Sequence, residues 1–402
     1  MERVTPAYFI RPLRWQIEPA FDATGLRRGT AGRGQISVVN IYRIDPVERY
    51  SLRSFWRDTR DRIVAWEKST APTHNPMEKG RGDRYNYDAE GEVYSIWYEA
   101  LQAHDVANAS NPQRAEHFSY DSLGNRQGSN AVAGRGWVDF TRKDNGLNQY
   151  TRWTPSVINY NLNGAETSEG GMSMNFNGLN QPIALNSPTT LGSGTYLWFG
   201  YDPLGRCVKR WISPTSTTAP NGITFLYYDG WNLIQEKPAG ASAPHIYVQG
   251  AGMDELVADY NYATDAQWHY HHADARGHCI LLTGATGAVI EQYDYDAFGQ
   301  PYFYNASGQV LYGGSVQGNR FLFSGREWLK ELRAYDFRNR LYLPQLGRFI
   351  QPDPVGLQIA GQAPIGAMAA FGDVPKVFAS SEFNLYRYCH NDPINQKDPT
   401  GC

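Results

Sequence analysis

The 402-residue sequence has only four cysteines, Cys207, Cys279, Cys389 and Cys402, and no CxxC pair among them. Single cysteines so far apart indicate neither a disulfide framework nor a zinc site. The sequence also lacks an excess of one charge, because 37 basic and 40 acidic residues leave a net charge of −3. That balance gives no electrostatic basis for binding a nucleic-acid backbone or an anionic membrane. We therefore expect no nucleic-acid partner.

Long apolar runs are missing as well. No stretch of the sequence reaches the roughly 18 apolar residues of a membrane-spanning helix, and residues 1–6 lack the apolar core of a signal peptide. There is no glycine-rich phosphate loop, no Gly-x-Ser-x-Gly elbow and no HExxH motif. We expect no cofactor, no membrane span and no export signal within this chain.

The residues that are abundant point to strands and tight turns. The sequence has 40 glycines, 23 prolines, 27 tyrosines and 11 tryptophans, and only 19% of its residues are charged. A hydrophobic share of 41% can form a sizeable core, which argues against disorder. Tyr and Trp favour strands, whereas Gly, Asn and Pro favour turns. The composition therefore predicts an all-β protein.

A short motif, Tyr-Asp-x-x-Gly, repeats along the chain. It occurs at 87–91, 120–124, 201–205 and 295–299, and degenerate copies begin at Asn145, Asn177 and Asp229. Asp followed three residues later by Gly is typical of a type I β-turn. Alternating residues flank the turns, as in 195–201 and 206–211. Each unit of 24 to 33 residues is thus predicted to be a hairpin that extends its neighbour's sheet.

These repeats resemble the YD repeats of RHS proteins, of the C components of Tc toxins and of teneurins. The match is strongest over 271–299, which is similar to the longest repeat of that family. The segments NRFLFSGREW (319–328), GRFIQPDPVGL (347–357), NLYRY (384–388) and NDP (391–393) resemble the RHS-repeat-associated core domain. The resemblance predicts divergent repeats over 1–80, YD repeats over 81–318 and a core domain over 319–402.

The resemblance also implies a function. In such proteins one long curved sheet spirals into a shell, the core domain plugs it, and a polymorphic C-terminal toxin is enclosed and cut free by aspartyl-protease-like chemistry. Carried over to this sequence, the candidate catalytic residues are Asp353, Asp398 and Arg340, and Arg348 is a further candidate for orienting a carboxylate. Two carboxyls must be able to share a proton for this chemistry.

Several features of the sequence argue against assigning the family's self-cleavage to this chain by resemblance alone. Asp-Pro-x-Gly is also an ordinary turn, and three other Asp-Pro pairs, at Asp45, Asp202 and Asp392, carry no catalytic hypothesis. Leu343 stands where the family usually has Asp, which would impair cleavage if that carboxylate belonged to the active pair. The sequence stops at Cys402, where a toxin would follow. Residues 358–382, rich in Ala and Gly, are predicted to be a flexible loop.

Other patterns have an ordinary structural interpretation. His269, His271, His272 and His278 near Asp274 could suggest a metal, but they belong to the long repeat, and we expect no metal site. The Arg-Gly-Asp tripeptide at 81–83 directly precedes a YD hairpin and is expected to be part of it. Tyr and Trp side chains could stack on sugars, yet cross-strand packing on a broad sheet explains them.

Two functions follow from the sequence. The first is a segment of an encapsulating RHS shell, secreted or at the cell surface as part of a larger protein. Its expected partners are further N-terminal repeats, a C-terminal toxin, and components of a secretion system or toxin complex. The alternative is a wall-associated YD protein for adhesion or carbohydrate binding. About ten hairpins are few for a sealed shell, so we expect open sheet edges and a tendency of the isolated chain to associate.

Overall fold

We describe the fold from a computed structural model of the chain. It describes residues 16–19, 37–42, 49–58, 60–69, 81–103, 109–130, 136–153, 156–187, 195–213, 222–262, 266–274, 276–354 and 384–402. The predicted loop at 358–382 and most of 1–80 lie outside these residues. The chain divides into two compact units, 1–117 and 118–402, and the division falls within strand β7.

The first unit is an antiparallel meander in which each strand pairs with the next. Its strands are β1 (Gln16–Pro19), β2 (Ser37–Tyr42), β3 (Arg49–Arg57), β4 (Ile63–Ser69), β5 (Arg81–Tyr87), β6 (Val93–Leu101) and the start of β7 (Arg114–Tyr120). The tripeptide at 81–83 lies in β5, where Asp83 is buried and accepts a hydrogen bond from the backbone of Glu99 at 3.0 Å. It is therefore a structural part of the hairpin.

The second unit continues the same pattern, since every strand from β7 to β24 pairs antiparallel with its successor. The strands after β7 are β8 (Arg126–Ser129), β9 (Val138–Arg142), β10 (Tyr150–Trp153), β11 (Ser156–Tyr160), β12 (Glu166–Glu169), β13 (Met172–Phe176), β14 (Pro182–Ser187), β15 (Thr195–Tyr201), β16 (Cys207–Ser213), β17 (Ile223–Asp229), β18 (Asn232–Pro238), β19 (His245–Gln249), β20 (Leu256–Asn261), β21 (Gln267–Ala273), β22 (Cys279–Thr283), β23 (Val289–Tyr295) and β24 (Pro301–Asn305).

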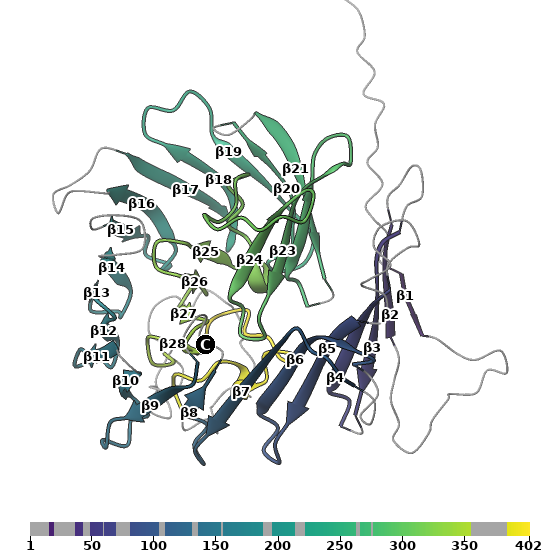
Figure 1. The fold of residues 1–402 in the computed structure, drawn as a ribbon. Helices are drawn as coiled ribbons and strands as arrows, with labels where there is room; N and C mark the ends of the chain where they lie inside the picture. Colours follow the sequence, from purple (N-terminus) through teal and green to yellow (C-terminus); the bar gives the residue numbers. More distant parts are fainter. Residues whose placement is uncertain are drawn as a thin grey trace, which may run out of the picture. The chain divides into compact units, whose positions relative to one another are not determined.

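A second, four-stranded sheet follows in the chain, and the long sheet of this unit curves around it (Figure 1). Its strands are β25 (Glu327–Leu329), β26 (Ala334–Asp336), β27 (Leu341–Leu343) and β28 (Arg348–Phe349), accompanied by the single 3-10 turns η1 (Phe323–Gly325) and η4 (Cys389–Asn391). The all-β prediction, with a curved hairpin sheet and a C-terminal core segment, is confirmed.

The YD motifs form the hairpin tips that the sequence predicts. At Asp121, the backbone carbonyl accepts from Gly124 N at 2.9 Å, while Oδ1 accepts from the backbone N–H groups of Leu123 and Asn125, both at 2.9 Å. Gly124 has a φ of 70°, which residues other than glycine rarely adopt. The motif residues are therefore selected by turn geometry.

The repeat is also more regular than the Tyr-Asp-x-x-Gly motif alone indicates. The same turn closes at Asn161, where Gly164 N donates to its carbonyl at 3.1 Å, and at Asn305, where Gly308 N does so at 3.0 Å. Asn accepts the same backbone bonds as Asp, so Tyr-Asn-x-x-Gly is an equivalent motif. Asp229 is different, because it pairs directly with Asn232 across a two-residue turn.

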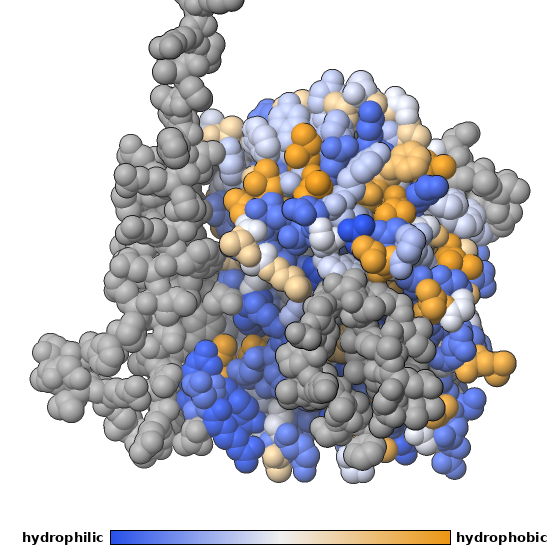
Figure 2. All heavy atoms as spheres, turned by 180° about the vertical axis from the view of Figure 1, so that it is seen from behind, coloured by the Kyte–Doolittle hydropathy of each residue, from blue (hydrophilic) through white to orange (hydrophobic). Residues whose placement is uncertain are grey.

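Apolar side chains fill the space between the two sheets. One buried cluster joins Phe140 and Leu197 of the long sheet to Leu343 of the small sheet. A second joins Leu282 of the long sheet to Tyr342 and Phe349. By contrast, the face of the molecule in Figure 2 mixes hydrophobic with hydrophilic residues. The core segment is thus held to the inner face of the sheet by hydrophobic burial.

Candidate active site

Two aspartates that are 45 residues apart in the sequence meet at one guanidinium group. Arg340 Nη2 lies 3.2 Å from Asp353 Oδ2 and 3.2 Å from Asp398 Oδ2. Asp353 follows β28, Asp398 begins the last turn of the chain, and Arg340 precedes β27. The structure therefore brings together three of the four residues that the sequence proposes as catalytic.

Arg340 is fixed from several sides and is 3% exposed. Its Nε donates to the Gly401 carbonyl at 2.6 Å and its Nη1 to the Leu385 carbonyl at 3.0 Å. The guanidinium carbon lies 3.6 Å from the centre of the Phe349 ring, a cation–π contact. A guanidinium held in this way keeps both carboxylates in place.

The two carboxyls have different surroundings. Asp398 Oδ1 accepts from Gly401 N at 2.8 Å and from Cys402 N at 3.0 Å, and its side chain is 12% exposed against 17% for Asp353. Burial raises the pKa of Asp398 above its usual value, and the nearby Asp353 carboxylate adds to this, against the lowering effect of Arg340 and the two amides. Asp398 therefore keeps its proton to a higher pH than an ordinary aspartate.

Cys402 also lies at this site, but its chemistry is not that of a nucleophile. Asn339 Nδ2 lies 3.3 Å from its sulfur. Burial raises the pKa of the Cys402 thiol to about 12. Because only a thiolate attacks efficiently, a thiol that keeps its proton near neutral pH is a poor nucleophile.

Arg348 does not join the two aspartates, contrary to the expectation that it orients one of them. Its Nη2 donates to the Asn148 carbonyl at 2.7 Å, and its guanidinium carbon lies 4.1 Å from the Tyr150 ring centre. Arg348 is therefore a contact between the core segment and the β9–β10 turn. Leu343, which stands where the family usually has Asp, lies in the apolar cluster with Phe140 and Leu197.

Near Arg348 the structure holds a pair of buried carboxyls that sequence reasoning missed. Glu166 and Glu169 are 2% and 5% exposed, and their side chains share a hydrogen bond. Trp153 Nε1 donates to Glu169 Oε1 at 2.5 Å. Burial raises the pKa of both groups, that of Glu169 to about 7, and Arg348 only partly offsets this for Glu166.

The pair makes stability depend on pH. Between about pH 4.5, the ordinary value for glutamate, and about 7, the folded chain binds a proton that the unfolded chain has released. The free energy of unfolding should therefore fall as the pH rises through this window. We expect a Glu169→Gln variant to lose less stability from pH 5 to pH 8 than the unsubstituted chain, measured by urea unfolding. Equal slopes for both chains would contradict the shared proton.

The histidines of the long repeat bind side chains of the protein. His271 and, outside that repeat, His245 each donate from Nε2 to the Asp259 carboxylate, at 2.6 and 2.7 Å. His271 Nδ1 in turn lies 3.8 Å from the sulfur of Cys279, so that Asp259, His271 and Cys279 follow one another as the acid, base and thiol of a thiol enzyme do. Cys279 is buried, however, and burial raises the pKa of its thiol. Within the described residues, no group of His, Cys, Asp and Glu is arranged to hold a metal ion.

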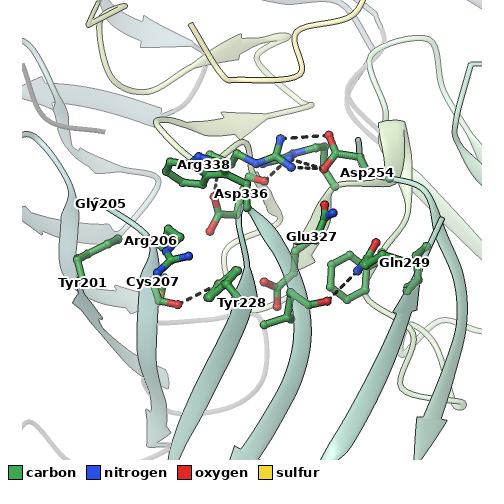
Figure 3. A pocket seen from close by; sticks show the side chains of 17 residues that line it. Tyr201, Gly205, Arg206, Cys207, Tyr228, Gln249, Asp254, Glu327, Asp336 and Arg338 are labelled. Carbon is green, nitrogen blue, oxygen red and sulfur yellow. Dashed lines mark hydrogen bonds and ion pairs between the residues drawn. The ribbon is translucent and has the colours of Figure 1, made fainter. Parts of the chain in front are cut away.

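One cavity lies between the long sheet and the core segment. Its volume is about 70 Å³, room for about two water molecules. Figure 3 shows Arg338 and Asp254 on its lining, together with Cys207, Tyr228 and Asp336. Across the described part of the chain, no helix is long and apolar enough to span a membrane.

Comparisons with known proteins agree with this fold. No family model matches the chain. Its sequence is 25% identical over 287 residues to the tRNA3(Ser)-specific nuclease WapA of Bacillus spizizenii and, equally, to the tRNA nuclease WapA of Bacillus subtilis, covering 71% of this chain but 11% of each relative. The chain thus spans about a tenth of the length of these curated relatives.

Solved structures of Tc toxins are similar as well. The crystal structure of TcdB2–TccC3 without its hypervariable C-terminal region matches 96% of this chain and 19% of its own, at a TM-score of 0.64 and 15% identity. The Photorhabdus luminescens Tc holotoxin pore matches 90% of this chain and 17% of its own, at a TM-score of 0.62 and 16% identity. The chain therefore has the fold of the matched fifth of these toxin structures, as the resemblance to RHS/YD-repeat proteins predicts.

Proposed function

We propose that this chain is part of an RHS-type shell that encloses a C-terminal polymorphic toxin and cuts the chain just beyond its own core segment. The observation that carries the proposal is the meeting of Asp353 and Asp398 on Arg340, directly beside the last residues of the chain. The shell fold and the similarity to WapA support the encapsulating part. The chain would be secreted or surface-exposed as part of a larger protein, with further repeats and toxin-complex components as partners.

The chemistry follows from the charges. One guanidinium balances one carboxylate, so the second carboxyl is stabilised as the neutral acid, and the raised pKa of Asp398 makes it that acid. Asp353, as carboxylate, takes a proton from water, while Asp398 donates a proton to the scissile peptide group. Water adds across the bond and leaves a carboxyl and an amine. Cleavage should slow when the pH rises above the pKa of Asp398, because the acid is then lost.

The test uses the chain extended by a reporter segment after Cys402. We expect the reporter to be released without added protease, at a rate independent of protein concentration, because the reacting groups belong to one molecule. Circular dichroism confirms that the extended chain is folded. A folded chain that retains its reporter for days over pH 4 to 8 would refute cleavage and leave the shell assignment standing. A glycan array with hits lost on Tyr or Trp substitution would favour the adhesion alternative.

A further inference from the structure

Three consecutive side chains donate hydrogen bonds to three consecutive backbone carbonyls near residue 402. Arg338 Nη1 donates to the carbonyl of Pro399. Asn339 Nδ2 donates to the Thr400 carbonyl at 3.0 Å, and Arg340 Nε donates to the Gly401 carbonyl at 2.6 Å. Each step of one residue in 338–340 thus corresponds to a step of one residue in 399–401, so the contact defines a register between the two segments.

The turn that carries the donors is rigid. It joins β26 to β27, with Phe337 N donating to the Arg340 carbonyl at 3.0 Å and Asn339 N to the Phe337 carbonyl at 2.8 Å. Arg338 has φ 70°, and its N–H donates to Asp336 Oδ1 at 2.7 Å. A non-glycine residue persists in this conformation only where its surroundings fix it.

Arg338 is in turn held by the long sheet. Its Nη2 and Nη1 lie 2.6 and 3.1 Å from the two carboxylate oxygens of Asp254, in the turn between β19 and β20. Arg326 Nη1 binds the same carboxylate at 2.9 Å. Figure 3 shows the Arg338 guanidinium and Asp254 facing each other. This bidentate pairing fixes the direction of the arginine.

The opposite side of the terminal segment is also bound. The N–H groups of Gly401 and Cys402 both donate to Asp398 Oδ1. A Cβ at Gly401, which has φ 71°, would lie 2.1 Å from the Phe337 carbonyl oxygen. Only glycine therefore fits at 401, whereas the side chain of Pro399 is exposed.

We propose that Arg338 and Asn339 are positioning residues that, with Arg340, clamp the main chain of 399–401 and determine which peptide bond faces Asp353 and Asp398. The inference rests on the proposed self-cleavage and explains why one particular peptide bond would be cut. The substrate is this chain's own backbone, recognised by three carbonyls and by a glycine at 401. The exposed side chain at 399 and the sequence beyond 402 have little influence.

The test measures where the extended chain is cut, by intact mass spectrometry, in Asn339→Ala and Arg338→Met variants. A clamp predicts cleavage that is about tenfold to 10²-fold slower and products that begin at more than one residue. Gln396→Ala, an exposed neighbour of the segment, is the control and should cut at one bond at the normal rate. A single unchanged cut at an unchanged rate in both clamp variants would overturn the proposal.

A second measurement does not depend on cleavage. In the unextended chain, hydrogen exchange of a peptide covering the last residues should show protected N–H groups at 401 and 402. Asn339→Ala should increase their exchange, whereas Gln396→Ala should not. If the extended chain does not cleave but this difference is seen, self-cleavage fails and the clamp stands. Equal protection in Asn339→Ala and the unsubstituted chain would refute the clamp.

Discussion

Replacing Asp353 by asparagine should slow release of a reporter placed after Cys402 by about 10²–10⁴-fold. Asparagine keeps the size of the side chain but cannot take a proton from water. Asp398→Asn should have an effect of the same order, because an amide in that place cannot deliver a proton to the peptide bond. The combined variant should be little slower than either single one, since the two carboxyls act as one unit. Single-turnover release, followed by gel or mass spectrometry, measures all three.

The chain offers a matched control for these substitutions. Asp202 opens the same Asp-Pro-x-Gly sequence as the two candidate aspartates, but it caps the turn between β15 and β16 and pairs with Arg206 at 2.7 Å. Asn occupies the equivalent position in the turn at Asn177, so Asp202→Asn should fold and release the reporter at the normal rate. Equal slowing by Asp202→Asn and Asp353→Asn would show that turn formation, and not acid–base chemistry, limits the reaction.

The hairpin repeat could be predicted from the sequence because its signal is local. Asp and Gly three residues apart determine one turn, and that turn aligns the two strands beside it. The copies at Asn161 and Asn305 were missed because Asn was accepted only in the degenerate copies at Asn145 and Asn177. The full motif was defined with Asp alone, although Asn accepts the same bonds. The two-residue turn after Asp229 shows the limit of the motif, since Gly at 230 directly follows the aspartate.

Only part of the candidate site could be predicted from the sequence, because its residues come together through long-range contacts. Asp353, Asp398 and Arg340 were chosen through resemblance, and no spacing in the sequence shows that they meet. The buried pair Glu166 and Glu169 was missed because residues three apart in a strand should face opposite sides of a sheet. A register shift in the β11–β12 pairing, where Ser168 faces Asn159 and Glu166 faces Tyr160, brings both to the inside.

Arg340→Met should lower the free energy of unfolding by about 3–5 kcal/mol near pH 7. Methionine retains much of the packing on Phe349, but it leaves two carboxylates together with no cation and leaves the carbonyls of Leu385 and Gly401 without their donor. Urea unfolding at pH 7 measures the loss. Reporter release should fail in the same variant, because the guanidinium that holds both carboxyls in place is then missing.

The pH dependence separates this electrostatic cause from simple loss of packing. Arg340 lowers the pKa of Asp398, so without it the pKa of this carboxyl in the folded chain should rise further above about 4, the ordinary value for aspartate. The folded variant then binds protons that the unfolded variant has released, so its stability increases as the pH falls toward 4 and its deficit shrinks. Adding Asp398→Asn removes one of the two charges and should restore part of the stability at pH 7. If the unsubstituted chain and Arg340→Met keep a constant difference from pH 4 to pH 8, the pairing of Arg340 with the two aspartates does not stabilise the fold.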